Sequence, residues 1–245
     1  MRIALVSDIH GNLPALEAVV ADIRRRGVDQ IVNLGDILSG PLLPRQTARY
    51  LMAQGWVTLA GNHERQLLDP LHPARSASDA YAQSCLGSVE LDWLAALPGA
   101  VQLNDEVFLC HGTPGSDSTY FLETAIPGGL RVASSEEVEQ RLAGQISTVV
   151  ACGHTHIPRC LRTRAGQLLV NPGSTGLPAY DDDQPCWHVA ETGSPDARYA
   201  VIERHQGRWS AALHAVPYDF EPMARLADQN GQAGWARALR TGYMR

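Results

Sequence analysis

Short apolar runs recur along the first two thirds of the chain. We expect each run to form a buried strand, because continuous β-branched and aliphatic stretches are typical of strands that are covered on both faces. These runs are residues 3–6, 30–34, 56–60, 107–110 and 148–152. Apolar residues at helical spacing lie between them, over residues 13–26, 44–54, 63–97 and 134–143. This alternation of strand and helix predicts an α/β arrangement.

The last third of the chain has a different pattern. Four further strands are expected there without long helices between them, at residues 159–164, 167–170, 198–204 and 209–216. Residues 221–240 have the spacing of one or two helices, whereas residues 112–133 are rich in Gly, Pro, Ser and Thr and predict a long loop. We therefore expect α/β layers around one mixed sheet or two packed sheets.

Composition narrows the class of protein. The chain has 245 residues, 44% of them hydrophobic, which suits one large domain or two small ones with a real core. A net charge of -6 argues against a general nucleic-acid-coating protein. All 20 residues counted as Lys or Arg are arginine, which excludes P-loop and Schiff-base lysine chemistry. No apolar stretch resembles a signal peptide or a membrane helix, so we expect a soluble, cytoplasmic protein without a membrane partner.

Five polar clusters each follow one of the apolar runs of the first two thirds. Because ligands bind beyond the carboxyl ends of strands in open α/β sheets, we expect these clusters to meet at one edge. The clusters are Asp8-Ile9-His10, Gly35-Asp36, Gly61-Asn62-His63-Glu64, His111-Gly112 and Gly153-His154-Thr155-His156. Each alone has an ordinary explanation as a turn or a surface pair. Together, carboxylates, an amide and imidazoles without sulfur favour Mn, Fe, Zn, Ni or Co over a structural thiolate zinc.

The ordered set DxH, GD, GNHE, HG and GHTH resembles the calcineurin-like metallophosphoesterases over about residues 1–175. Further stretches at residues 7–12, 171–174 and 216–219 resemble a bacterial subgroup of about this size. The resemblance implies a four-layer sandwich of two packed mixed β-sheets flanked by helices. We accordingly expect a single metallophosphoesterase domain over residues 1–245, with a short helical C-terminal extension at about 219–245.

The resemblance also implies a dinuclear metal centre whose ligands are all present in this chain. One divalent ion would be held by Asp8, His10, Asp36 and His156, and the other by Asp36, Asn62, His111 and His154. Asp36 would bridge both ions, and a bridging hydroxide would attack phosphorus. His63 would stand off the metals and assist the leaving group. The positive charge of two such ions would exceed the negative charge of two aspartates and a hydroxide, so the site would attract a phosphate group.

Departures from relatives bear on the substrate. Protein phosphatases and dinucleotide polyphosphate hydrolases of this superfamily usually carry an arginine soon after the second motif, and Gly35 to Gly40 has none. They also tend to have HGG, whereas this chain has His111-Gly112-Thr113. These departures disfavour a serine/threonine protein phosphatase or a dinucleotide polyphosphate hydrolase, which stays the alternative function. Some small relatives that favour diesters lack the histidine equivalent to His63, and its presence here leaves a phosphomonoester open. We expect a small phosphodiester slightly ahead of a phosphomonoester. A non-catalytic scaffold is disfavoured because no metal-ligand position is missing. A nuclease that acts on long nucleic acids is disfavoured by the negative net charge of the chain. Whether the protein forms a homo-oligomer stays open.

Several residues outside the motifs have two interpretations. Three arginines lie near the motifs in the sequence: Arg45, Arg65 and Arg159. Each would either contact the substrate phosphate or be a solvated surface residue. The segment 178–194, which contains three consecutive aspartates, is a surface loop or a cover over the site. The apolar face of the tail packs on the domain, or forms a lid or dimer contact.

Overall fold

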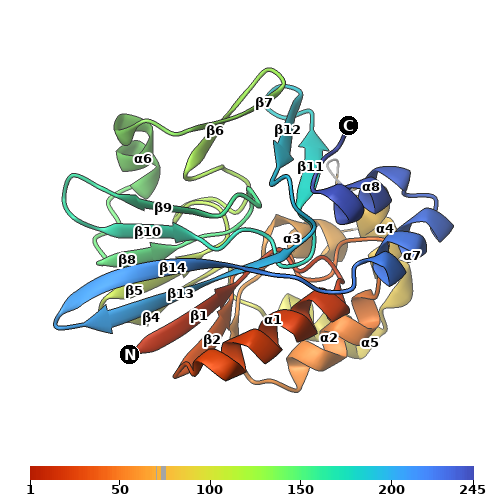
Figure 1. Ribbon diagram of the computed structural model, residues 1–245, viewed down its shortest axis with the longest axis horizontal. Coiled ribbons are helices and arrows are strands. Elements are labelled where there is room, and N and C mark those ends of the chain that lie inside the picture. The colour runs from red at the N-terminus through yellow and green to blue at the C-terminus, as the bar shows by residue number, and fades with distance from the viewer. Residues whose placement is uncertain (70, 73–75) are drawn as a thin grey trace.

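The computed structural model describes residues 1–69, 71–72 and 76–245, and its main feature is a pair of stacked five-stranded sheets (Figure 1). The strands of the first sheet, in spatial order, are β14 (Arg208–Val216), β13 (Ala197–His205), β1 (Arg2–Val6), β2 (Gln30–Asn33) and β3 (Val57–Thr58). Those of the second are β4 (Ala100–Asn104), β5 (Val107–Cys110), β8 (Val149–Ala151), β10 (Leu168–Asn171) and β9 (Arg159–Arg162). Both sheets are mixed, which confirms the expected fold class.

Alternating side chains of β1 explain how the layers are held together. Ile3 and Leu5 face the second sheet and share one buried cluster with Val107, Val149 and residues of β10. The intervening side chains of β1 face the opposite way and pack against a helix. Burying such an aliphatic side chain stabilises the fold by about 1.5–3 kcal/mol, so this two-sided burial fixes β1 in the middle of the molecule.

Helices cover the outer faces of both sheets. Within the described residues they are α1 (Leu13–Arg26), α2 (Pro44–Met52), α3 (Asn62–Leu68), α4 (Ala77–Cys85), α5 (Ser88–Ala95), α6 (Ser135–Leu142), α7 (Glu221–Gln229) and α8 (Ala233–Thr241). Helix α1 packs on the first sheet and α6 on the second, which completes four layers. No helix among the described residues is both long enough and apolar enough to cross a membrane.

One sequence expectation about strands was wrong, and one strand was missed. Residues 112–133 are not one loop, because β6 (Glu123–Ile126) and β7 (Gly129–Val132) form an antiparallel hairpin within them. Its turn is Pro127-Gly128, where Gly128 has a φ of 86° that glycine adopts without strain. The Gly and Pro content therefore marks a tight turn. Strand β4 was not expected, because its sequence alternates only weakly between hydrophobic and polar residues. It gains stability from pairing with β5.

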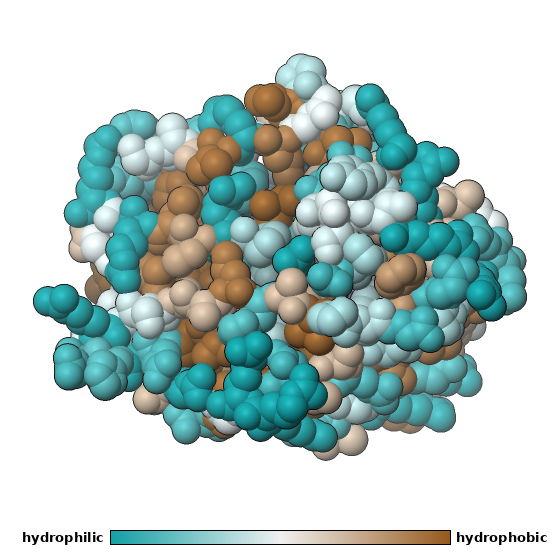
Figure 2. All heavy atoms as spheres, in the orientation of Figure 1, coloured by the Kyte–Doolittle hydropathy of each residue, from teal (hydrophilic) through white to brown (hydrophobic). Residues whose placement is uncertain are grey.

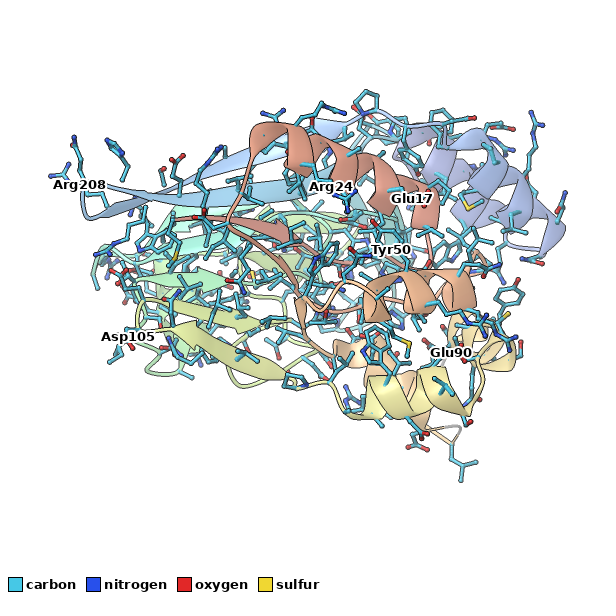
Figure 3. All side chains as sticks on the ribbon, turned by 90° about the horizontal axis from the view of Figure 1, so that it is seen from below. Glu17, Arg24, Tyr50, Glu90, Asp105 and Arg208 are labelled. Atoms are coloured by element: carbon cyan, nitrogen blue, oxygen red, sulfur yellow. The ribbon has the colours of Figure 1, made fainter. Side chains whose placement is uncertain are left out.

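The parallel strands of each sheet end at the same edge of the molecule. Strands β1, β2 and β3 run parallel in one sheet, and β5, β8 and β10 do so in the other. The hairpin turns that carry Asp105 and Arg208 lie at the far end of the sheets, away from α2 and α5 (Figure 3). The loops that follow the parallel strands are thereby collected at the opposite edge.

The C-terminal helices and one more hairpin border that edge. Strands β11 (Ala179–Asp182) and β12 (His188–Glu191) pair antiparallel, so the segment 178–194 is a hairpin and not an irregular surface loop. The tail forms two helices, and the apolar faces of α7 and α8 pack against Leu42 and Leu43. The exterior over these helices is mainly hydrophilic (Figure 2), as expected when the apolar face is turned inward.

Candidate metal centre

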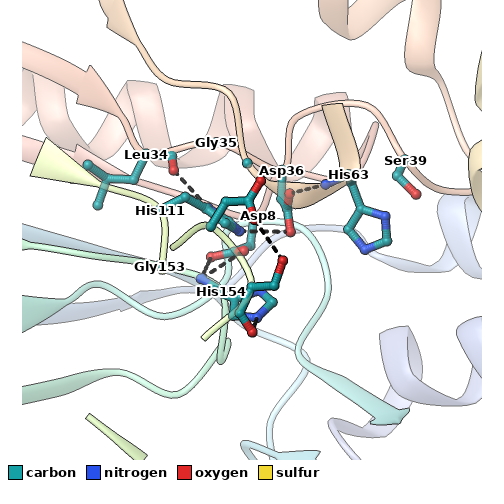
Figure 4. A network of polar contacts seen from close by, with 12 residues as sticks. Asp8, Leu34, Gly35, Asp36, Ser39, His63, His111, Gly153 and His154 are labelled. Carbon is teal, nitrogen blue, oxygen red and sulfur yellow. Dashed lines mark hydrogen bonds and ion pairs between the residues drawn. The ribbon is translucent and has the colours of Figure 1, made fainter. Parts of the chain in front are cut away.

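The site residues expected from the sequence lie in the loops after β1, β2, β5 and β8 and at the start of α3, which follows β3. Figure 4 shows Asp8, Asp36, His111 and His154 turned toward one another, with His63 directed to one side of them. Two compact groups have ligand atoms that all lie within 4.8 Å of one another: Asp8, His10 and His156 in one, and Asp36, His111 and His154 in the other. Asn62 opens α3 beside them.

Backbone carbonyls fix the orientation of three imidazoles. His10 Nδ1 lies 2.7 Å from the Ser39 carbonyl, and His156 Nδ1 lies 2.7 Å from the Leu177 carbonyl. His111 Nδ1 lies 2.8 Å from the carbonyl of Leu34. A carbonyl only accepts, so each Nδ1 carries a proton, and in the neutral form of each ring Nε2 directs a lone pair to the cluster. This arrangement is the one that metal-ligating histidines use.

These lone pairs face other acceptors at short range. His10 Nε2 and His156 Nε2 are 3.1 Å apart, and His111 Nε2 is 3.0 Å from Asp36 Oδ2. Two acceptors at such distances repel unless a proton or a cation lies between them. Burial and the neighbouring His156 lower the pKa of His10 to about 3, which disfavours a proton on that ring. Without a metal ion, the nearby Asp36 outweighs burial and raises the pKa of His111 to about 10, so a proton on Nε2 satisfies the contact with Asp36. A metal cation would replace that proton and would also satisfy the contact between His10 and His156.

Orphaned buried atoms point to the same conclusion. The Oδ1 of Asn62 and the Nε2 of His111 are buried and have no hydrogen-bond partner of good geometry. Burying an unpaired polar atom costs about 1–3 kcal/mol, so such atoms at one spot require an explanation. Oxygen and imidazole nitrogen are suitable donors for Mn, Fe, Zn, Ni or Co, and the residues present therefore fit two divalent ions.

The charge states of Asp36 and His154 suit metal binding. Burial alone would raise the pKa of Asp36, but His111 and His63 outweigh burial and hold it well below its ordinary value. Burial and the nearby His111 lower the pKa of His154 to about 4, which favours the neutral ring. Ionised carboxylates and neutral imidazoles are the forms that coordinate metals.

Backbone strain is concentrated in the same residues. Seven residues other than glycine have a positive φ in the described chain, and five of these belong to the cluster: Asp8, His10, Asp36, His154 and His156. Their φ angles lie between 51° and 70°. Each such residue costs about 1–3 kcal/mol and persists only where the surroundings enforce it. The loops therefore hold these side chains inward at a cost in stability.

Glu64 connects two of the loops beneath the cluster. Its buried carboxylate accepts backbone N–H groups from Asp36 at 2.9 Å, from Ile37 at 2.8 Å and from Gly61 at 2.8 Å. The loop after β2 is thereby tied to the loop after β3. This contact fixes the position of Asp36 relative to Asn62, since Asn62 directly follows Gly61.

Gly61 leaves no space for a side chain. A Cβ at this position would overlap Asp36 Oδ1. We expect Gly61→Ala to displace the Asp36 carboxylate and weaken binding of Mn²⁺ at least about tenfold, as changes that disturb ligand orientation do. Calorimetric titration with Mn²⁺ measures this. Gly99→Ala is the matched control, because a Cβ at Gly99 meets nothing within 4 Å; equal Mn²⁺ affinities in the two variants would contradict the expectation.

His63 is held by a residue that the sequence analysis missed. Its Nδ1 lies 2.8 Å from the buried Oδ1 of Asp79, at the start of α4. Burial opposes protonation of His63, but Asp36 and the hydrogen bond to Asp79 outweigh burial and raise its pKa to about 9. The spacing Ser76-x-x-Asp79 predicts a helix start, which the structure contains, but it gives no sign of the contact with His63.

A cavity of about 910 Å³ opens over the cluster, with walls from α3, β6, β11 and α8. Arg65 lines it, but its guanidinium binds both carboxylate oxygens of Asp117, at 2.8 and 2.9 Å. Arg159 is paired with buried Glu123 and Arg45 is exposed, so neither is directed to the cluster by a contact seen here. The cavity is far larger than a phosphate group requires.

Comparisons with known proteins agree with this geometry. A model of the calcineurin-like phosphoesterase superfamily domain matches residues 1–194. The uncharacterized protein MJ0912 of Methanocaldococcus jannaschii is 26% identical over 199 residues, which are 72% of this chain and 76% of that protein. The crystal structure of a metallophosphoesterase from Sphaerobacter thermophilus has a TM-score of 0.77 at 24% identity, covering 99% of this chain and 100% of that one. The hypothetical protein PH1004 of Pyrococcus horikoshii gives 0.74 at 17% identity, covering 99% and 98%.

Proposed function

The chain belongs to the calcineurin-like phosphoesterase superfamily, and from this premise we propose that it hydrolyses a small phosphoester at two divalent metal ions. The observation that carries the proposal is the convergence of two carboxylates and four imidazoles in two adjacent groups, in which His10 Nε2 and His156 Nε2 face each other at 3.1 Å. Such a set suits divalent cations, and the two facing ring nitrogens cost stability when no cation lies between them.

The protein side chains divide into ligands and a leaving-group residue. We assign one ion to Asp8, His10 and His156, and the other to Asn62, His111 and His154, with Asp36 shared between them. When bound, such ions polarise the phosphoryl oxygens and make water a better nucleophile. Glu64 ties the loop that carries Asp36 to the start of α3, which carries Asn62, and such supporting hydrogen bonds hold the ligands in position before a substrate arrives.

His63 is assigned to the leaving group. Its Nδ1 is held by Asp79, which leaves Nε2 directed to the cavity as the atom that donates a proton or a hydrogen bond. The ring lies edge-on to His10, with 5.4 Å between ring centroids, and is therefore beside the cluster without belonging to it. General acid catalysis of this kind contributes about 10²–10⁴ in rate.

The cavity favours a substrate with a single phosphoryl group. Of the arginines that line it within the described part of the chain, Arg65 is bound by Asp117, and Arg141 donates to the carbonyls of Phe121 and Glu123 at 3.1 and 2.8 Å. A chain of additional phosphates needs unpaired cations, so a dinucleotide polyphosphate is disfavoured. The volume of about 910 Å³ leaves room for organic groups on the phosphorus and favours a small diester.

Hydrolysis of bis-p-nitrophenyl phosphate by chelator-stripped protein, titrated with Mn²⁺, tests the proposal. We expect turnover that is absent without metal and saturates as the ions are added. The monoester p-nitrophenyl phosphate, measured in parallel, gives the preference between diester and monoester. Absence of turnover on both esters at saturating Mn²⁺ would contradict the proposal and favour the non-catalytic scaffold.

Asp79 is a positioning residue in this account, acting through His63. We expect Asp79→Asn to reduce hydrolysis of a phenyl ester about 10–100-fold, and that of the p-nitrophenyl ester much less, because a good leaving group needs little assistance. Steady-state kinetics on both esters measures the difference. Ser76→Ala is the control, since it removes the helix cap over Asp79 but not the bond to His63. An equal loss on both esters would exclude this role.

A further inference from the structure

One wall of the cavity is built by parts of the chain that lie outside the metal-binding loops. Helix α8 contributes Trp235, and the β11–β12 hairpin contributes Tyr180. Both pack on a small apolar cluster formed by Leu177, Ala179 and Ala238. Residues more than fifty positions apart along the chain therefore form one continuous apolar surface beside the metal ligands.

Each aromatic ring of this wall contacts an expected metal ligand. Trp235 lies edge-on to His10, with 5.7 Å between centroids, and Tyr180 lies edge-on to His156, with 4.7 Å between centroids. His10 and His156 belong to the same metal-binding group. A phosphoester whose phosphoryl group lies at the cluster would therefore place an attached organic group against Trp235 and Tyr180.

The two rings are held in place without a ligand. The Tyr180 hydroxyl lies 2.7 Å from that of Tyr120, which lies 2.8 Å from Nε2 of His188. On the other side, the indole of Trp235 reaches Gly40, where a Cβ would come within 3.0 Å of the ring. A preformed surface loses little conformational entropy on binding, which is a property of built ligand sites.

The surroundings of the wall select against negative charge. Asp181 and Asp182 line the same part of the cavity, next to Tyr180 in β11. A second phosphate placed near the wall would lie in a cavity whose lining includes these carboxylates, and their negative charge would weaken its binding. An uncharged ring would instead gain stacking and burial against the indole.

Resting on the proposed function, we infer that Trp235 and Tyr180 form the binding subsite for the organic group of the phosphoester, and that this group carries a flat, uncharged ring. Trp235 is then a specificity-determining residue supplied by the C-terminal helix. Aryl esters and nucleoside esters share this chemistry.

Equilibrium binding of two phosphonates tests the subsite without turnover. Phenylphosphonate and methylphosphonate differ in the ring and have no ester bond to hydrolyse. In the Mn²⁺-loaded protein, calorimetry should find phenylphosphonate bound at least about tenfold more tightly, because stacking and burial of a ring are worth that much. Trp235→Ala should bring the ratio of the two affinities close to one. Its affinity for methylphosphonate should stay within about twofold of that of the unaltered protein, which also shows that the variant is folded.

Two further variants make the test specific. Trp235→Phe should keep most of the ratio, since a flat ring remains. Trp187→Ala should keep all of it, because Trp187 is exposed and stacks with Arg245 outside the cavity lining. A ratio near one in the unaltered protein, or an intact ratio in Trp235→Ala, would overturn the inference. If the unaltered protein binds phenylphosphonate more tightly than methylphosphonate but hydrolyses neither ester, the proposed function alone is overturned.

Discussion

Replacement of Asp36 by Asn is expected to abolish metal-dependent phosphoester hydrolysis, with a loss of at least about 10³ in kcat. Asn keeps the shape of the side chain but loses the charge and one of two oxygens that a shared ligand needs. The lost stabilisation of bound ions and of developing charge amounts to several kcal/mol, and each 1.36 kcal/mol is about tenfold in rate. The buried position of Asp36 between His111 and the N–H of His63 makes compensation by water ineffective.

The expected loss is measured by Mn²⁺ titration of turnover together with metal content of the purified variant. Asp29→Asn is the control, because the Asp29 side chain is 68% exposed and lies beside the N-terminus. Thermal unfolding of both variants separates loss of the fold from loss of the site. Turnover within tenfold of the unaltered protein would exclude Asp36 as a shared ligand.

The second large effect is expected for His63→Ala, which should lower turnover about 10²–10⁴-fold while metal content stays unchanged. His63 is hydrogen-bonded to Asp79 and lines the cavity, but it belongs to neither compact group of metal ligands. Its removal should therefore affect the departing alkoxide and not the ions. The loss should be larger for a phenyl ester than for a p-nitrophenyl ester.

Steady-state kinetics on both esters, with metal analysis of the same sample, checks this expectation. His205→Ala provides the matched control, since His205 is exposed at the end of β13. Unchanged turnover on the phenyl ester would rule out the leaving-group role. Loss of one ion from His63→Ala would show instead that the ring supports metal binding.

The cluster could be predicted from the sequence because its members share one rule. Each follows an apolar run, and parallel strands bring their carboxyl ends to the same edge. Asp8, His111 and His154 are far apart in the chain, yet each is marked by its strand and a neighbouring small or polar residue. The same runs predict α/β layers, since strands buried on both faces need layers on either side, whereas the choice of two packed sheets over one came from the family resemblance.

The remaining parts of the site lack such a rule. Asp79 contacts His63 only because α4 packs on α3, and a single aspartate at a helix start gives no sign of that contact. The sequence places Trp235 on the apolar face of a tail helix, and this position suits a core residue and a cavity-lining residue equally well. The β6–β7 and β11–β12 hairpins depend on cross-strand pairing, which local composition describes poorly.

The central claim is that two divalent ions are bound by the loops at the carboxyl ends of the parallel strands. Anomalous diffraction from crystals grown with Mn²⁺ tests it most directly. The account predicts two strong peaks, one among Asp8, His10 and His156 and the other among Asp36, His111 and His154. One peak only, or peaks away from these side chains, would contradict it.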